Sequence, residues 1–121
     1  MPLIEKPDSL QNLSAKVSQF AADRDWRQFH SPKNLSMALA VEAAELLEIF
    51  QWLEGDESHN LSAAQRVASE HEVADILLYL LRFCEMTQID LIAAAEAKIK
   101  LNAEKYPVEL AKGKATRAAD L

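Results

Sequence analysis

The segments Glu42-Ala43-Ala44-Glu45 and Glu72-Val73-Ala74-Asp75 each place two acidic side chains three residues apart within apolar sequence. Residues three apart share one face of a helix, so each segment directs two carboxylates towards one place. At about 100° per residue, both faces are otherwise apolar: Leu35, Leu46, Ile49 and Leu53 lie around Glu42, and Ile76, Tyr79 and Phe83 lie around Glu72. A buried carboxylate is costly unless it is paired or bound to a cation. The four acids therefore predict a divalent metal site.

The sequence around these acids predicts an all-α chain with a four-helix bundle-like fold. Helix start signals are Ser9 or Asp8, Ser31 before Pro32, Ser62 with Gln65, and Asp90. The expected helices end near Arg24, Leu53, Met86 and Lys105, where Pro107 stops the last one. No strand alternation or internal repeat occurs in the sequence. We expect one domain over residues 1–121, with an extended arm at about 1–8 and a tail at about 108–121.

The centre of the expected third helix, Ile76-Leu77-Leu78-Tyr79-Leu80-Leu81, is apolar all round. A helix of this kind is buried on every side. In a chain of 121 residues, that burial points to a second subunit, so we expect a homo-oligomer. The single cysteine, Cys84, lies in the same helix and is expected to fill the core.

The composition excludes several classes of function. The net charge of −6 argues against a nucleic-acid polymer as partner. With two glycines in the chain, Gly55 and Gly113, a glycine-rich phosphate loop is impossible. No apolar run reaches the ~18 residues of a membrane span, and the N-terminus does not resemble a signal peptide. We expect a cytoplasmic protein with no membrane partner.

The donor atoms predict the metal. Carboxylate oxygens are hard ligands that favour Mg²⁺ or Mn²⁺ over zinc. Di-iron bundles add a histidine three residues after a glutamate, whereas here Glu45 is followed by Glu48 and Glu72 by Asp75. This pattern suits phosphate chemistry. The glutamates Glu45, Glu48 and Glu72 are the candidate catalytic groups, and the sequence leaves open which of them is the general base.

Several other polar and aromatic residues can be interpreted either as structural residues or as contacts to a ligand. Trp26 and Trp52 are either core residues or platforms on which a nucleobase stacks. His30 is either a ligand contact or a loop histidine. Lys98 and Asn102 recur with Lys105 at helical spacing, as an exposed charged face or as a site for the distal phosphates of a triphosphate. The residue pattern alone leaves these readings open.

Several stretches together resemble the MazG-like nucleoside triphosphate pyrophosphohydrolases, and among them the dCTP pyrophosphatase subgroup. The resemblance covers about residues 9–110. It is carried by Asp25-Trp26-Arg27-Gln28-Phe29-His30-Ser31-Pro32-Lys33-Asn34-Leu35, Glu42-x-x-Glu45, Phe50-Gln51-Trp52, Glu72-x-x-Asp75, Tyr79, Lys98, Asn102 and Tyr106-Pro107.

The resemblance implies an all-α dimer, or a dimer of dimers, with Mg²⁺ held by Glu42, Glu45, Glu72 and Asp75. It implies a pocket for the base and sugar and a contact to the phosphates. The implied pocket residues are Trp26, His30, Trp52, Tyr79 and Asn102, with Lys98 near the phosphates. Some relatives carry a histidine at the position of Val17, so their base selectivity does not transfer as a whole.

We therefore expect magnesium-dependent hydrolysis of a (deoxy)nucleoside triphosphate to the monophosphate and pyrophosphate, with dCTP or a modified dCTP as substrate and nucleotide pool cleansing as the role. One alternative is a broad or dUTP-type pyrophosphatase. Another is a non-enzymatic helical module that binds a partner through the apolar third helix.

Overall fold

A computed structural model of the protein describes residues 9–121, and the expected arm at 1–8 lies outside the described residues. These described residues contain helices and turns and no strand, so the prediction of an all-α chain is confirmed. The α-helices are α1 (Leu10–Asp23), α2 (Pro32–Phe50), α3 (Ala63–Thr87), α4 (Leu91–Lys105) and α5 (Val108–Ala111). Short 3₁₀ helices occur at Arg27–Phe29, Gly55–His59 and Ala118–Asp120.

The predicted caps begin the long helices. The side chains of Ser9, Ser31, Ser62 and Asp90 each accept a hydrogen bond of 3.1 Å from the backbone N–H three residues on. Each such bond satisfies an amide that has no partner within its helix. The Ser62 backbone N–H donates to Gln65 Oε1 at 2.9 Å and completes the expected capping box.

The structure differs from the predicted helices at the end of α2, in the segment 54–60 and in the tail. α2 ends at Phe50 rather than near Leu53. The segment 54–60 contains a 3₁₀ turn with its own capping box between Glu54 and Glu57, because paired side-chain caps can order a short polar segment. The tail likewise contains α5, which begins directly after Pro107.

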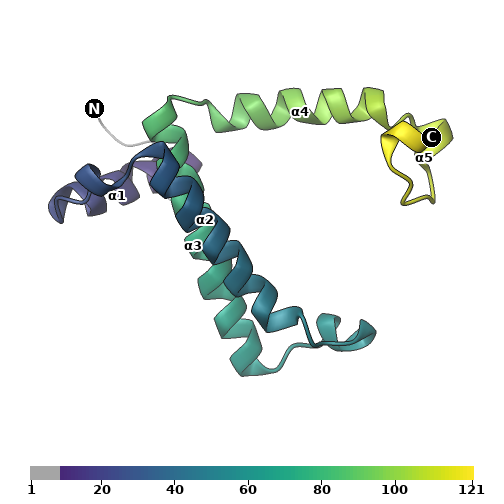
Figure 1. Cartoon of the computed structure of the whole chain (residues 1–121), viewed down its shortest axis with the longest axis horizontal. Helices are drawn as coiled ribbons and strands as arrows, with labels where there is room; N and C mark the ends of the chain where they lie inside the picture. The colour runs from purple at the N-terminus through teal and green to yellow at the C-terminus, as the bar shows by residue number, and fades with distance from the viewer. Residues whose placement is uncertain (1–8) are drawn as a thin grey trace. The chain divides into compact units, whose positions relative to one another are not determined.

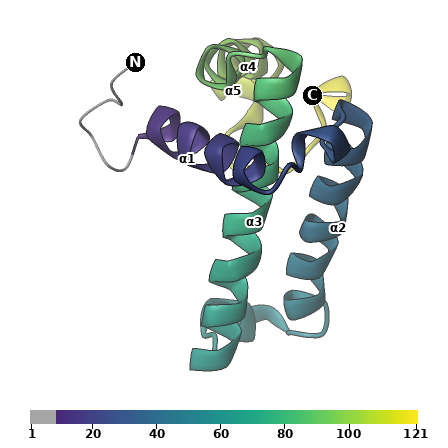
Figure 2. The ribbon, with the colours of Figure 1, turned by 90° about the vertical axis from the view of Figure 1, so that its left-hand side faces the viewer.

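The described chain divides into two compact units, the first ending at Gln88 and the second beginning at Ile89. A single domain over residues 1–121 stays a prediction. In the first unit, α2 and α3 lie side by side and antiparallel, and α1 crosses α3 (Figures 1 and 2). Its buried apolar side chains are Ala21, Leu35, Leu81 and Cys84. Cys84 is thus a core residue, as expected, and burial raises the pKa of its thiol.

Many large apolar side chains remain exposed in the chain. Leu47 of α2 is 60% exposed and Val73 of α3 is 55% exposed. In the second unit, α4 exposes Ile92, Ile99 and Leu101, and α5 exposes Val108 and Leu110. None of the described helices has the length and apolar character needed to cross a membrane.

Candidate active site

The pairing of α2 with α3 brings carboxylates from both helices together. Glu42 and Glu45 lie one turn apart on α2, and Glu72 lies on the neighbouring α3. One carboxylate oxygen from each of these three residues lies within 4.8 Å of the other two. The i, i+3 spacing on one helix and the contact between the helices together produce this three-carboxylate cluster.

The three-carboxylate cluster is not satisfied by the described part of the chain. Glu42 Oε2 and Glu72 Oε2 are both buried and have no hydrogen-bond partner. Burial is the largest cause that raises the pKa of Glu42 to about 7, followed by the neighbouring carboxyls of Glu72 and Glu45 and then by the charges of Glu45 and Asp75. Buried, unpartnered oxygens of like charge are the arrangement that a hard divalent cation stabilises. The residues present therefore fit a metal of the Mg²⁺ or Mn²⁺ type.

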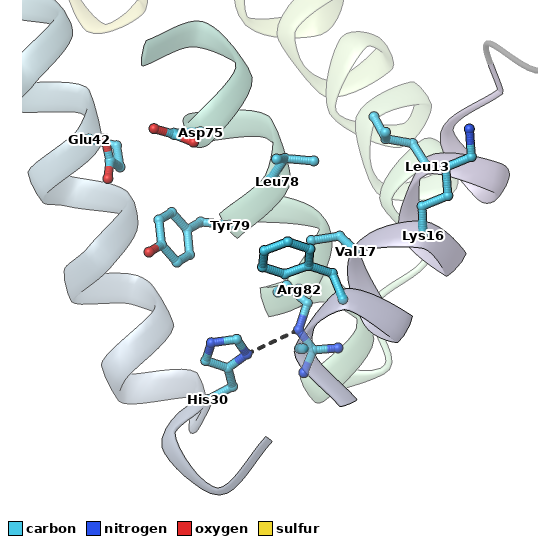
Figure 3. A pocket seen from close by; sticks show the side chains of 11 residues that line it. Leu13, Lys16, Val17, His30, Glu42, Asp75, Leu78, Tyr79 and Arg82 are labelled. Atoms are coloured by element: carbon cyan, nitrogen blue, oxygen red, sulfur yellow. Dashed lines mark hydrogen bonds between the residues drawn. The ribbon is translucent and has the colours of Figure 1, made fainter. Parts of the chain in front are cut away.

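Asp75 lies beside this cluster and faces the main cavity. It is not among the three residues whose oxygens meet within 4.8 Å, but its charge acts on Glu42, and both side chains line a cavity of about 390 Å³ (Figure 3). Pockets for small ligands have volumes of about 300–1,000 Å³. The cavity therefore has room for a nucleoside-sized group next to the carboxylates.

The main cavity is lined by side chains from α1, α2 and α3 and by His30, which directly precedes the Ser31 cap of α2. Its lining residues are Leu13, Lys16, Val17, Phe20, Ala21, His30, Glu42, Asp75, Leu78, Tyr79 and Arg82. One wall is mostly apolar and includes Leu13 and Val17, with Lys16 beside them (Figure 3). The other wall carries Tyr79, His30 and the two acids (Figure 3).

Glu48 lies in a second hollow of the same helix pair. This hollow of about 360 Å³ is lined by Glu45, Glu48, Ile49, Ala68 and Glu72. The cluster thus contributes Glu42 to the main cavity and Glu45 and Glu72 to the second hollow. Its carboxylates can be reached from both, and Glu48 stands beside two of them.

Tyr79 and His30 are the two predicted ligand contacts that line the main cavity, and their surroundings shift the pKa of each. Burial raises the pKa of the Tyr79 phenol, and the charges of Glu42, Asp75 and Glu45 raise it further. Burial lowers the pKa of His30, as does the positive charge of Arg82. A neutral phenol and a neutral imidazole each carry one hydrogen-bond donor.

Trp26 is held against the wall of the main cavity without lining it. Its ring packs edge-on against His30, with centroids 6.4 Å apart, and against Phe20, with centroids 5.7 Å apart. The indole is 43% exposed. Trp26 therefore supports two lining residues, and direct stacking on a base stays a prediction.

Three predicted substrate contacts lie outside the cavity lining. Trp52 follows α2 and is 84% exposed. Lys98 and Asn102 are exposed residues of α4 in the second unit. Their roles stay predictions.

Sequence reasoning missed Arg82 and Lys16, which also line the main cavity. Arg82 is 1% exposed and forms an ion pair of 2.8 Å with Glu85. The sequence does indicate a buried ion pair here, because an arginine directly follows the apolar run 76–81 and a glutamate lies three residues later. Lys16 gave no signal, because one lysine in an amphipathic helix is typical of an exposed face.

Comparison with known proteins places the chain in a family. The model of the MazG-like family matches residues 37–121. The dCTP pyrophosphatase 1 of Bos taurus is 39% identical over 115 residues, which cover 93% of this chain and 68% of that protein. The human dCTP pyrophosphatase 1 is 36% identical over the same shares. The crystal structure of a pyrophosphatase from Archaeoglobus fulgidus superposes with a TM-score of 0.77 at 38% identity, covering 81% of this chain and 92% of that one. The chain therefore belongs to the MazG-like family and is a pyrophosphohydrolase.

Proposed function

We propose that this nucleoside triphosphate pyrophosphohydrolase acts on dCTP or a modified dCTP and releases the monophosphate and pyrophosphate. The observation that carries the proposal is the three-carboxylate cluster beside a cavity of nucleoside size. The names of the relatives, dCTP pyrophosphatase 1, support cytosine nucleotides as substrates. The corresponding role is removal of such nucleotides from the precursor pool.

Glu42, Glu45, Glu72 and Asp75 are the residues that would hold Mg²⁺, with Mn²⁺ as a substitute. The unpartnered oxygens of Glu42 and Glu72 support this assignment. When bound, the cation supplies Lewis-acid stabilisation of the negative charge that develops on the phosphate oxygens.

The carboxylates also serve as proton acceptors in the proposed reaction. A water molecule attacks the α phosphorus in line, and its oxygen forms the new P–O bond. The bond from the α phosphorus to the bridging oxygen of the pyrophosphate breaks. One of Glu45, Glu48 and Glu72 orients the water and accepts its proton. Glu48 is supported by its exposed position in the hollow that Glu45 and Glu72 also line.

The remaining wall of the main cavity would bind the nucleoside. His30 and Tyr79 offer hydrogen bonds from positions in its lining, and Trp26 buttresses His30. Trp52 and Asn102 are further proposed contacts to base and sugar, and Lys98 to the phosphates.

We propose a homo-oligomer, a dimer or a dimer of dimers. The exposed Leu47 and Val73 of the first unit and Ile99 of the second support it, because monomers rarely expose so many large apolar side chains. Light scattering on the purified chain measures the molar mass. A mass of 13.5 kDa at micromolar concentration would contradict the assembly.

Pyrophosphate release across a panel of nucleotides tests the substrate. We expect the highest kcat/KM for dCTP or 5-methyl-dCTP, no turnover without a divalent cation, and a kcat at least about 10²-fold lower for Glu72→Gln. The matched control is Glu70→Gln, which changes an exposed carboxylate of the same helix. Equal rates on all triphosphates, or a preference for dUTP, would contradict the cytosine assignment and leave the pyrophosphohydrolase chemistry in place.

A further inference from the structure

Arg82 is a buried cation at the end of the main cavity away from the carboxylates. It is 1% exposed, and each nitrogen of its guanidinium has a partner. Nη1 donates to Glu85 Oε2 at 2.8 Å, Nη2 to Met86 Sδ at 3.6 Å, and Nε to His30 Nδ1 at 3.2 Å. Burying a charge in this way is costly and is often no more stable than apolar packing, so its presence calls for an explanation other than stability.

The partners of Arg82 are themselves fixed. The Ser18 hydroxyl donates to Glu85 Oε1 at 2.8 Å, and Arg27 Nη2 donates to Ser18 Oγ at 3.1 Å. The network joins α1, α3 and the 3₁₀ turn that precedes His30. Each oxygen of Glu85 accepts a bond, so the guanidinium has little freedom to rotate away from His30.

The bond between Arg82 and His30 determines where the imidazole proton lies. An arginine Nε always donates, so His30 Nδ1 must offer its lone pair. A neutral imidazole carries one N–H, which is then on Nε2, the nitrogen on the side of the ring away from Arg82 (Figure 3). The lowered pKa of His30 is consistent with a neutral ring.

We infer that Arg82 is a positioning residue of the nucleotide site, which locks His30 in the Nε2–H tautomer so that a fixed hydrogen-bond donor serves the main cavity. The recognised group is a hydrogen-bond acceptor on the base or sugar of the nucleotide. The identity of this ligand rests on the proposed function, whereas the tautomer does not. Arg82 touches His30 and acts through it.

The tautomer is measured directly by long-range ¹H–¹⁵N spectra of protein labelled in its histidines, His30, His59 and His71. In the wild type we expect a single Nε2–H form of His30. In Arg82→Met we expect a mixture of tautomers, and in Arg66→Met, which removes an exposed arginine of the same helix, no change. An Nδ1–H form or a tautomer mixture at His30 in the wild type would overturn the inference, even if the Arg82 variant failed to fold.

Kinetics separate positioning from a general effect on the fold. Arg82→Met should raise KM for the preferred nucleotide about tenfold, on the scale of one lost hydrogen bond, with kcat nearly unchanged. His30→Gln carries its own amide donor, so adding Arg82→Met to that background should raise KM less than twofold. An equal rise in both backgrounds, or an unchanged KM in a folded Arg82→Met protein, would overturn the inference. If the wild type hydrolyses no nucleoside triphosphate, the proposed function fails, and the spectra still decide the tautomer.

Discussion

The main cavity has charged groups at two ends, and the two ends differ in whether these buried groups have hydrogen-bond partners. At one end, Arg82 is fully buried, and its guanidinium contacts His30, Glu85 and Met86. At the other end lies Glu42, and a buried oxygen of Glu42 and one of Glu72, which lines the second hollow, have no partner in the described chain. Glu72 and Arg82 both lie on α3, nearly three turns apart. The difference therefore does not come from the helix itself.

Arg82 has hydrogen-bond partners from the chain itself, so it is part of the folded scaffold. The carboxylate oxygens of Glu42 and Glu72 that have no partner are available to bind a ligand. The Arg82 end can be assembled before any ligand arrives, because its partners are supplied by α1, α3 and the loop before α2. The carboxylate end is costly without a cation, because burial first, and then the neighbouring acids, disfavour the charged form of Glu42 and raise its pKa. Removing one charge from each end should therefore have opposite effects on stability.

The largest expected effect is on turnover at the carboxylate end. Glu72→Gln keeps the shape of the side chain and removes one anionic ligand, so we expect kcat to fall at least about 10²-fold, the scale of losing one preorganised electrostatic group. Steady-state pyrophosphate release measures it. The control Glu70→Gln should keep wild-type kcat, and turnover by Glu72→Gln at the wild-type rate would remove Glu72 from the site.

Mg²⁺ should stabilise the folded protein through the same end. A cation that binds only the folded state at 100 times its Kd adds about 2.7 kcal/mol to the free energy of unfolding, so Tm should rise by several degrees. Thermal unfolding with and without Mg²⁺ measures the shift, and EDTA should reverse it. In the Glu42→Gln/Glu72→Gln protein the shift should vanish. A persistent shift there would place the cation elsewhere.

Arg82→Met should destabilise the protein. His30 loses its donor and Glu85 loses its ion pair, but the Glu85 side chain is 35% exposed and keeps Ser18 and solvent. We expect a loss of about 2 kcal/mol in the free energy of unfolding, measured by urea denaturation. Arg66→Met removes an ion pair in which both partners are largely exposed and should cost less than about 0.5 kcal/mol. A neutral Arg82→Met would mean that the two ends do not differ.

The smallest effect is a gain. Glu42→Gln removes a carboxylate whose charged form is disfavoured by burial and by neighbouring acids, and it should stabilise the metal-free protein by about 1 kcal/mol above neutral pH. The pKa of Glu42 is about 7 in the folded protein against 4.5 ordinarily, so the folded state binds the proton more tightly. The free energy of unfolding of the wild type should therefore fall as pH rises between these values.

Urea denaturation across this pH range, compared between wild type and Glu42→Gln, tests the sign. A slope that is the same in both proteins would assign the pH dependence to other groups. The stabilisation by Mg²⁺ should increase over the same range, because the cation competes with the proton for Glu42.

The sequence by itself determined the helices and the acidic face that each helix presents, because both depend on local spacing. Serine and aspartate caps begin helices through bonds to residues three positions on. Two acids three residues apart must share a helix face wherever that helix packs. The sequence therefore predicted one site for Glu42, Glu45, Glu72 and Asp75, and the contact between α2 and α3 brings oxygens of Glu42, Glu45 and Glu72 within 4.8 Å of one another.

Only the tertiary structure decided which other residues meet at the cavity. Arg82 and His30 are separated by 52 positions, and no local rule pairs them. The crossing of α1 over α3 brought Lys16, Val17 and Phe20 into the lining, because helix packing fixes which face of α1 is covered. Local spacing determines what one helix presents, and long-range packing determines what it meets.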